Sequence, residues 1–222
     1  MIKPAPLLIL ISAPSGAGKT TLCDLLLKSR PEMTRAVTCT TRAPRAGEQD
    51  GVDYYFLKPE DFLRRVQSGN FLEHAQVFGN SYGLLKSELL GKLRTGKDVL
   101  LNVDVQGAAT IRAAAEEEPE LKRALVTVFL TTPSLEILEA RLKNRNADDP
   151  SVIKKRLQSA KQEVAQWKNF DYLVISTSKS EDLRRTLAVV EAEKMRVARS
   201  QAPDMEYVTM ELPAKAGRKA KT

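Results

Sequence analysis

A run of small residues at positions 13–20 has the composition of a phosphate-binding loop. It reads Ala-Pro-Ser-Gly-Ala-Gly-Lys-Thr, the pattern G-x-x-x-x-G-K-[ST] with Ala13 in place of the first glycine. Small side chains allow backbone N–H groups to approach phosphate oxygens. Lys19 would add a charge for the β- and γ-phosphates, and the Thr20 hydroxyl is placed to ligate Mg²⁺. The pattern predicts a nucleoside triphosphate site, bound with Mg²⁺, at Ala13, Pro14, Ser15, Gly16, Ala17, Gly18, Lys19, Thr20 and Thr21.

The segments on either side of this run support the prediction. Residues 7–11 form a short, continuous apolar run, typical of a strand covered on both faces, and residues 20–27 have helical spacing. The helix would direct the positive end of its dipole at the phosphates. A flexible Gly/Ser loop would explain the composition, but it would not predict Lys-Thr at this offset.

The rest of the chain alternates between strand-like and helix-like segments. Apolar runs at 99–103, 125–130 and 172–175 predict buried strands, and helical patterns fall at 108–115, 135–144, 152–166 and 182–199. This alternation predicts an α/β fold, a parallel sheet with helices on both faces. Residues from about 35 to 90 break the rhythm with short strand-like pieces at Val37, 54–56 and 71–72, which indicates a smaller inserted subdomain. A stretch rich in Arg and Lys at about 134–160 suits two helices joined by a mobile turn.

Five separate motifs occur in the order and spacing seen in guanylate kinases, and the resemblance covers roughly residues 5–198. The motifs are Ser12-Ala13-Pro14-Ser15-Gly16-Ala17-Gly18-Lys19, Thr40-Thr41-Arg42-Ala43-Pro44-Arg45-Ala46-Gly47-Glu48, Phe71-Leu72-Glu73-His74-Ala75, Phe78-Gly79-Asn80-Ser81-Tyr82-Gly83 and Asp104-Val105-Gln106-Gly107. The resemblance implies a P-loop NTPase-type domain over 1–200 with a core of 5–34, 95–132 and 168–200. It further implies a small α+β GMP-binding insert at 35–94 and a helical lid at 133–167. Residues 201–222 are expected to form a basic, mobile tail.

The resemblance also implies an acceptor site for GMP. Arg42 and Arg45 lie three residues apart beside a proline, and two guanidinium groups suit one phosphate. Glu73 resembles the residue that accepts hydrogen bonds from guanine N1–H and the 2-amino group, which adenine cannot donate in the same way. The GMP-binding set implied in this way is Thr38, Arg42, Arg45, Glu48, Tyr54, Glu73, Tyr82 and Asp104.

The lid and the loop would supply the charge needed for transfer of the γ-phosphoryl group of ATP to GMP. Arg141 and Arg145 are spaced i, i+4, so they share one face of a helix. A GMP phosphate is already ionised near neutral pH, so no general base is expected, and catalysis would consist of positioning and charge neutralisation. The residues expected to act catalytically are Lys19, Arg42, Arg141, Arg145 and Arg156.

Four positions depart from the family pattern. Leu84 replaces a hydroxyl-bearing residue after Tyr-Gly, and Asn102 replaces the first Asp of an Asp-x-Asp-x-Gln-Gly run. Ser176 stands where Asn often contacts adenine, and Asn146 stands where Gly is usual. Since Lys19 is retained, activity is expected, with weakened or altered affinity for GMP.

Composition narrows the partners and the compartment. Charged residues make up 28%, and the net charge is +7, of which +4 lies in residues 213–222 and +3 in the rest of the chain. The mildly cationic body suits the anionic substrates ATP and GMP, and neither nucleic acid nor a membrane is expected as a partner. Cys23 and Cys39 form no disulfide framework, so a cytoplasmic location is expected. The chain is expected to act as a monomer or homodimer.

Three alternative functions remain open from the sequence. A non-catalytic module of the same fold could bind peptides in the acceptor pocket, although such modules typically lack the intact loop seen at 13–20. A kinase for another phosphorylated acceptor is compatible with Leu84 but disfavoured by Glu73 and Thr38. A simple nucleotide hydrolase would leave the paired arginines and tyrosines without a purpose.

Overall fold

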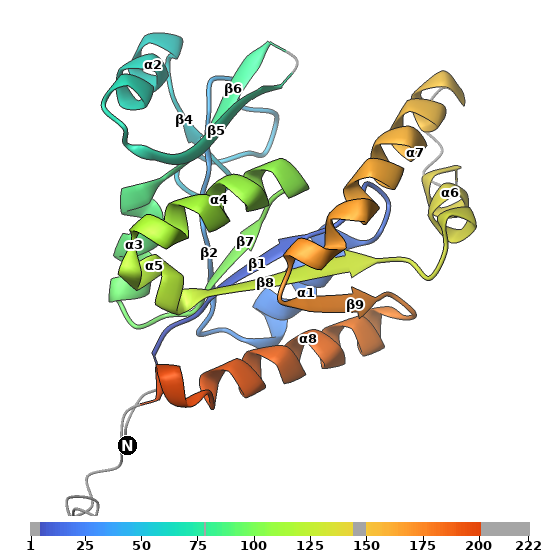
Figure 1. Cartoon of the computed structure of the whole chain (residues 1–222). Coiled ribbons are helices and arrows are strands. Elements are labelled where there is room, and N and C mark those ends of the chain that lie inside the picture. Colours follow the sequence, from blue (N-terminus) through green and yellow to red (C-terminus); the bar gives the residue numbers. More distant parts are fainter. Residues whose placement is uncertain (1–4, 78, 144–149, 201–222) are drawn as a thin grey trace, which may run out of the picture.

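The computed structural model describes residues 5–77, 79–143 and 150–200, and its core is a five-stranded sheet (Figure 1). In spatial order the strands are β2 (Thr34–Arg35), β7 (Val99–Asn102), β1 (Leu8–Ser12), β8 (Leu125–Thr131) and β9 (Tyr172–Ile175). Each strand runs parallel to its neighbours. The predicted parallel α/β architecture is therefore confirmed.

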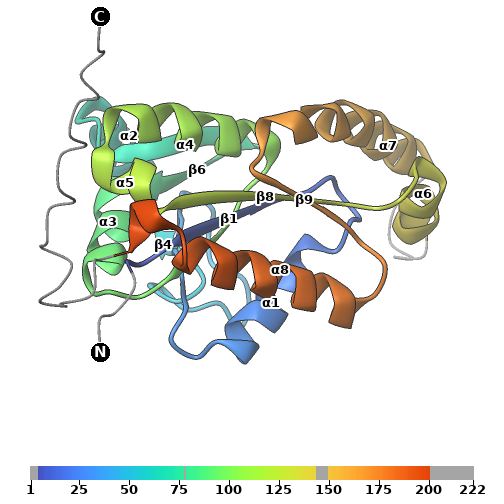
Figure 2. The same ribbon diagram turned by 60° about the horizontal axis from the view of Figure 1, so that its bottom comes forward.

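Helices cover both faces of this sheet, as Figure 2 shows from the side. One face carries α1 (Lys19–Ser29) and α8 (Lys179–Lys194), and the other carries α3 (Lys86–Arg94), α4 (Val105–Glu117) and α5 (Pro119–Ala124). Successive strand side chains point to opposite faces, so Ile9 and Ile11 pack toward α1, whereas Leu8 and Leu10 pack toward α3 and α4. All four are fully buried, which explains the continuous apolar run at this strand.

A second, smaller sheet forms the inserted subdomain. Its strands, in spatial order, are β4 (Tyr55–Phe56), β3 (Cys39–Thr40), β6 (Asn80–Leu85) and β5 (Phe71–Val77), and helix α2 (Pro59–Gln67) packs against it. Its own core is small, with four buried members: Cys39, Phe62, Phe71 and Leu85. Val37, expected in a strand-like piece, lies in the connection between β2 and β3 instead.

Helix α3 follows the small sheet along the chain but packs against the large one. Leu89 and Leu93 are almost fully buried and join the cluster formed by Leu8, Val99 and Leu101. The helix at the end of the 35–94 segment thus anchors the insert to the core.

Two further helices, α6 (Leu135–Lys143) and α7 (Pro150–Val164), project beside the sheet and are followed by the 3₁₀ turn η1 (Ala165–Asn169). Leu138 and Ala160 are fully buried against the core, so this pair is anchored at its base. A second 3₁₀ turn, η2 (Val197–Arg199), follows α8.

Arg145, Asn146 and the expected tail at 201–222 lie outside the described residues. Within the described ranges, no helix is both long and apolar enough to cross a bilayer.

Candidate active site

The predicted phosphate loop connects the end of β1 with the start of α1. Gly16 and Gly18 adopt φ values of 90° and 103°, in the left-handed region that favours glycine. Gly18 lies directly before α1, whose first residue is Lys19. The loop therefore ends on the first turn of a helix, where unpaired N–H groups and the helix dipole favour an anion.

Helix α6 rests directly on this loop. A Cβ atom placed on Gly16 would lie 3.0 Å from both Cγ and Cδ2 of Leu142 and 3.4 Å from Cδ1 of Leu138. Gly16 is thus required for its backbone conformation and for the close approach of α6. Any movement of α6 must be accompanied by a change in packing over the phosphate loop.

Lys19 points from the first turn of α1 toward the end of β7. Its Nζ donates a hydrogen bond to the Val103 carbonyl oxygen at 2.7 Å. Burial lowers the pKa of Lys19, and the nearby negative charge of Asp104 opposes that shift. Asp104 is held in place as the N-cap of α4, where its Oδ1 accepts from the Gly107 N–H at 2.8 Å.

The residues near Lys19 fit a magnesium ion delivered with a nucleotide. Thr20 is exposed on the first turn of α1, and Asn102 and Asp104 lie at the carboxyl end of β7. Among the described residues, no group of three or more His, Cys, Asp or Glu side chains could hold a metal alone. Mg²⁺ commonly takes one or two protein ligands and completes its shell with phosphate oxygens and water, so this sparse donor set suits it.

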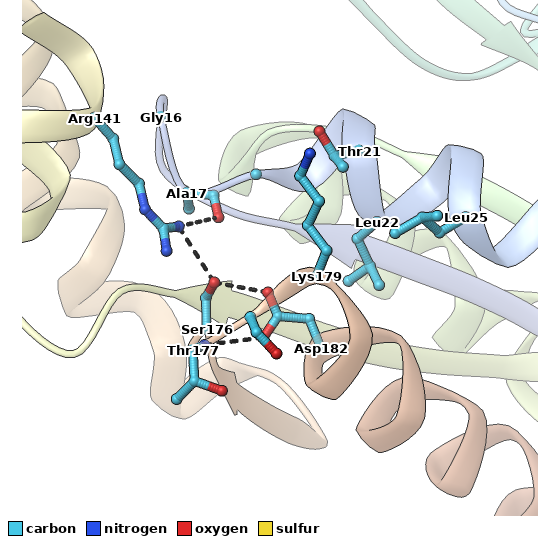
Figure 3. A pocket seen from close by; sticks show the side chains of 12 residues that line it. Gly16, Ala17, Thr21, Leu22, Leu25, Arg141, Ser176, Thr177, Lys179 and Asp182 are labelled. Atoms are coloured by element: carbon cyan, nitrogen blue, oxygen red, sulfur yellow. Dashed lines mark hydrogen bonds between the residues drawn. The ribbon is translucent and has the colours of Figure 1, made fainter. Parts of the chain in front are cut away.

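A pocket of about 790 Å³ lies beside the loop (Figure 3). Leu22 and Leu25 supply an apolar side, and Arg141 of α6 closes another. Arg141 Nη1 donates to the Ala17 carbonyl oxygen at 3.1 Å and to Ser176 Oγ at 3.2 Å. Through these hydrogen bonds, Arg141 links helix α6 directly to the phosphate loop.

The polar wall of the same pocket is organised by a buried acid. Asp182 accepts from Ser176 Oγ at 2.7 Å and from the Thr177 N–H at 3.0 Å (Figure 3). Ser176 is 3% exposed and Asp182 is 8% exposed. Sequence patterns gave no sign of this role, because Asp182 reads as one of the acids that favour the first turn of any helix.

The two predicted phosphate-binding arginines meet on the insert around one carboxylate. Arg42 Nη2 donates to both oxygens of Glu48, at 2.8 and 2.9 Å, and the Arg45 N–H donates to Glu48 Oε2 at 2.7 Å. These hydrogen bonds raise the pKa of Arg42 and lower the pKa of Glu48. Both Glu48 oxygens are engaged by the chain itself, so Glu48 fixes the fork of Arg42.

Two tyrosines of the predicted GMP-binding set stand beside Arg42. The rings of Tyr54 and Tyr82 are 6.2 Å apart in an edge-to-face arrangement. The Arg42 guanidinium lies 5.5 Å from the centre of the Tyr54 ring, and Tyr82 is a hydrogen-bonding neighbour of Arg42. Guanidinium and phenol donors thus gather at one place, as an anionic phosphate requires.

Glu73 is a partly buried carboxylate on β5. Burial, with the negative charge of Asp104 as a second cause, raises the pKa of Glu73 to about 7. A Cβ on Gly83 would lie 3.0 Å from the Glu73 carbonyl oxygen and 2.8 Å from Phe71, so Gly83 permits the close pairing of β5 with β6. The charge of Asp104 contributes to the pKa shifts of both Glu73 and Lys19.

The remaining sites fall in three different settings. Thr38 lies in the connection into the insert and accepts the Tyr55 N–H at 2.9 Å through its carbonyl oxygen. Leu84 is fully buried in the core cluster that includes Leu72 and Leu89, so it serves packing. Arg156 is half-buried on α7.

Glu163, on α7, is a further acid near the loop that sequence reasoning missed. Burial raises its pKa, and the charges of Lys19 and Asp104 act on it. In the sequence it falls on the polar face of a lysine-rich helix, so no local signal distinguishes it.

Comparison with known proteins agrees with this geometry. A sequence profile of the guanylate kinase family matches residues 5–193. A guanylate kinase from Alcanivorax borkumensis is 44% identical over 195 residues, 88% of this chain and 91% of that protein. One from Hahella chejuensis is 43% identical over 86% of this chain and 88% of its own. The crystal structure of guanylate kinase from Anaplasma phagocytophilum has a TM-score of 0.68 at 31% identity, covering 89% of this chain and 91% of that one. The matched profile and the identity to these relatives show that the chain belongs to the guanylate kinase family.

Proposed function

We propose that this protein transfers the γ-phosphoryl group of Mg-ATP to GMP, and to dGMP, giving ADP and the nucleoside diphosphate. The observation that carries the proposal is that one chain has both a phosphate loop with Lys19 and an insert on which Arg42, Tyr54 and Tyr82 lie together. The donor phosphates would lie on the loop and the guanine base at Glu73. The reaction belongs to cytoplasmic purine nucleotide metabolism.

The donor nucleotide would bind across the loop and the adjoining pocket. Backbone N–H groups from Ser15 to Thr20, other than that of Ala17, which donates to the Pro14 carbonyl oxygen, would surround the β-phosphate. Lys19 would move from the Val103 carbonyl to the β- and γ-phosphates. Bound magnesium, held through the phosphates with Thr20 as the protein ligand and Asp104 nearby, would neutralise charge on the β- and γ-oxygens. The base would enter the pocket bounded by Leu22, Leu25 and the hydroxyl-rich wall.

The acceptor nucleotide would be recognised at its phosphate and at its base. Arg42, Arg45, Tyr54 and Tyr82 would bind its phosphate, with Glu48 holding Arg42 in a fixed fork. An ionised Glu73 would accept from guanine N1–H and the 2-amino group, with Thr38 donating to O6. Discrimination of order 10⁴-fold is reached when the wrong base leaves a buried hydrogen-bonding group unpaired.

Transfer itself would need no general base. The GMP phosphate oxygen attacks the γ-phosphorus as the bond to the ADP oxygen breaks, and the negative charge shifts to ADP. Lys19, Arg42, Arg141, Arg145 and Arg156 would neutralise the transferring group. Closure of α6 and α7 over the loop would exclude water, which would otherwise accept the phosphoryl group.

A coupled assay of ADP release tests the proposal with Mg-ATP and GMP, AMP, CMP or UMP, in the wild type and in Glu73→Ala. Turnover with GMP alone, lost or relaxed in Glu73→Ala, is expected. Turnover with another acceptor would overturn the assignment of the base pocket. ATP binding without turnover on any of the four would overturn the proposed acceptor class.

A further inference from the structure

The insert is joined to the core by two chain crossings. One is the segment 36–38 between β2 and β3, and the other is the junction of β6 with α3 at residues 85–86 (Figure 1). Glu88 lies in the first turn of α3, next to the second crossing. We call these two crossings together the hinge. The Glu88 carboxylate reaches the first crossing, so one side chain that lies next to the second crossing also contacts the first.

Glu88 is buried and fully engaged. Its Oε1 accepts from the Val37 N–H at 2.9 Å, and its Oε2 accepts from the Tyr55 hydroxyl at 3.0 Å. Lys92, one helical turn further on, places Nζ 2.6 Å from Oε1. The Glu88 side chain is only 8% exposed, and a buried carboxylate is stable only when partners of this kind compensate for lost water.

The contacts of Glu88 fall one residue away from two predicted GMP contacts. Val37 precedes Thr38, and Tyr55 follows Tyr54. The Thr38 carbonyl oxygen accepts the Tyr55 N–H at 2.9 Å, so the two segments are tied to each other as well. Glu88 therefore holds the two segments that carry Thr38 and Tyr54.

The start of the first crossing is held to the core by β7 and by Lys92, the partner of Glu88. The Ala36 N–H donates to the Leu100 carbonyl oxygen of β7 at 3.0 Å. Lys92 donates to the Arg35 carbonyl oxygen at 2.7 Å while it pairs with Glu88. From Arg35 to Val37, successive backbone groups are thus bound first to Lys92, then to the core sheet, then to Glu88.

We propose that Glu88 is a positioning residue for the acceptor nucleotide, holding the hinge so that Thr38 and Tyr54 face GMP together. The inference rests on the proposed function, because it names a residue that acts through the GMP contacts. It places the effect of Glu88 on the acceptor site alone, since neither Val37 nor Tyr55 lies at the phosphate loop or its adjoining pocket.

Steady-state kinetics with each substrate varied in turn test this assignment in Glu88→Gln and Tyr55→Phe. Glu88→Gln removes the charge that pairs with Lys92 and one of two acceptors, so KM for GMP is expected to rise about tenfold. Tyr55→Phe leaves the Val37 contact in place, so a rise of about threefold is expected. In both variants kcat and KM for ATP should stay within about twofold of the wild type.

Glu120→Gln is the matched control. Glu120, on α5, pairs at 2.8 Å with Arg94, the last residue of α3, and loss of its charge should leave KM for GMP unchanged. A purely structural role for Glu88 would lower the melting temperature without separating the two KM values, and that result would overturn the proposal. If Glu88→Gln does not fold, an unchanged KM for GMP in Tyr55→Phe overturns it equally.

The wild-type arm separates this inference from the proposed function. A wild type inactive on GMP contradicts the proposed function itself. A wild type active on GMP, with both variants indistinguishable from it, contradicts only the role of Glu88.

Discussion

The proposed donor half of the site is formed mainly by backbone groups, whereas the proposed acceptor half is formed mainly by side chains. The phosphate loop is a backbone structure that lies between a fully buried strand and a helix of the main core. The proposed acceptor half consists of side chains on a small sheet and on the connection between β3 and β4, in an insert whose own core contains four buried residues. In the proposed assignment, donor binding depends on chain conformation and a single lysine, whereas acceptor binding depends on the placement of several side chains.

This difference predicts how each half responds to substitution. Changes in the donor half should abolish transfer, because the loop contacts the reacting phosphates. Changes in the acceptor half should act mainly through KM for GMP, because each residue supplies one of several contacts.

The largest effect is expected for Lys19→Met, which keeps the buried aliphatic stem and removes the charge. Loss of a preorganised charge at the reacting phosphates should lower kcat about 10³-fold. The coupled ADP-release assay measures this. Lys28→Met, an exposed lysine in the last turn of the same helix, should retain wild-type turnover. Lys19→Met turnover within tenfold of the wild type would show that the loop lysine does not act on the transferring group.

Arg42→Lys should have the next largest effect. Lysine keeps the charge but has a single nitrogen, so it cannot donate to the Ala43 carbonyl oxygen and to Glu48 from two nitrogens as Arg42 does, nor form a two-nitrogen contact with phosphate. KM for GMP should rise roughly 10- to 100-fold with little change in KM for ATP. Arg64→Lys, an exposed site on α2 of the same insert, is the control. An equal rise in both KM values would contradict the separation of the two halves.

The pH dependence of GMP binding should report on Glu73. Its pKa of about 7 in the free protein means that the carboxylate needed to accept from guanine is largely protonated at pH 6. KM for GMP should therefore rise about tenfold between pH 8 and pH 6. In Glu73→Gln the base-reading contribution to this slope should vanish, leaving only titration of the GMP phosphate. Identical slopes in the two proteins would contradict the role of Glu73.

The same pKa has a consequence for stability. The pKa of Glu73 is raised from 4.5 to about 7, so the folded protein binds the proton more tightly than the unfolded chain. Stability should then fall as pH rises from about 4.5 to 7 and stay lower above pH 7. Glu73→Gln should remove that loss and gain roughly 1–3 kcal/mol at pH 8, seen as a higher denaturant midpoint. No gain in stability at pH 8 would mean that burial does not disfavour the charged form of the Glu73 carboxylate.

Glu48→Gln should give the smallest effect. Glutamine keeps one oxygen to accept from Arg42 or the Arg45 N–H, so the fork is loosened and not lost. KM for GMP should rise about fivefold, with kcat unchanged. Glu60→Gln, on the first turn of α2, provides a matched acid in the same insert that should have no effect. An effect as large as that of Arg42→Lys would make Glu48 a direct contact instead of a support.

The strand and helix on either side of the phosphate loop were predicted well from the sequence because their signals are local. The apolar run at 7–11, the glycines and Lys-Thr lie within fourteen residues, and each has a direct physical meaning. The insert was harder to predict. Strand β6 contains Asn80, Ser81 and Gly83, which disfavour strands, and it forms because it pairs with β5 across a long register. Tertiary pairing decided this element, not propensity.

Supporting residues were the least predictable part of the site. Asp182, Glu163 and Glu88 act through partners that lie far away in the sequence or on other elements. Each occupies an ordinary polar position on a helix, so neither spacing nor composition singles it out. Such groups become visible only once the elements are assembled.

Transfer of label from [γ-³²P]ATP, in the presence of Mg²⁺ and GMP, tests the central claim most directly. The label is expected in GDP, with little inorganic phosphate, and its transfer should require both GMP and Lys19. Label released as inorganic phosphate regardless of GMP would mean that the protein is a hydrolase. Label that stays in ATP, despite nucleotide binding to a folded protein, would mean that the acceptor half does not serve GMP.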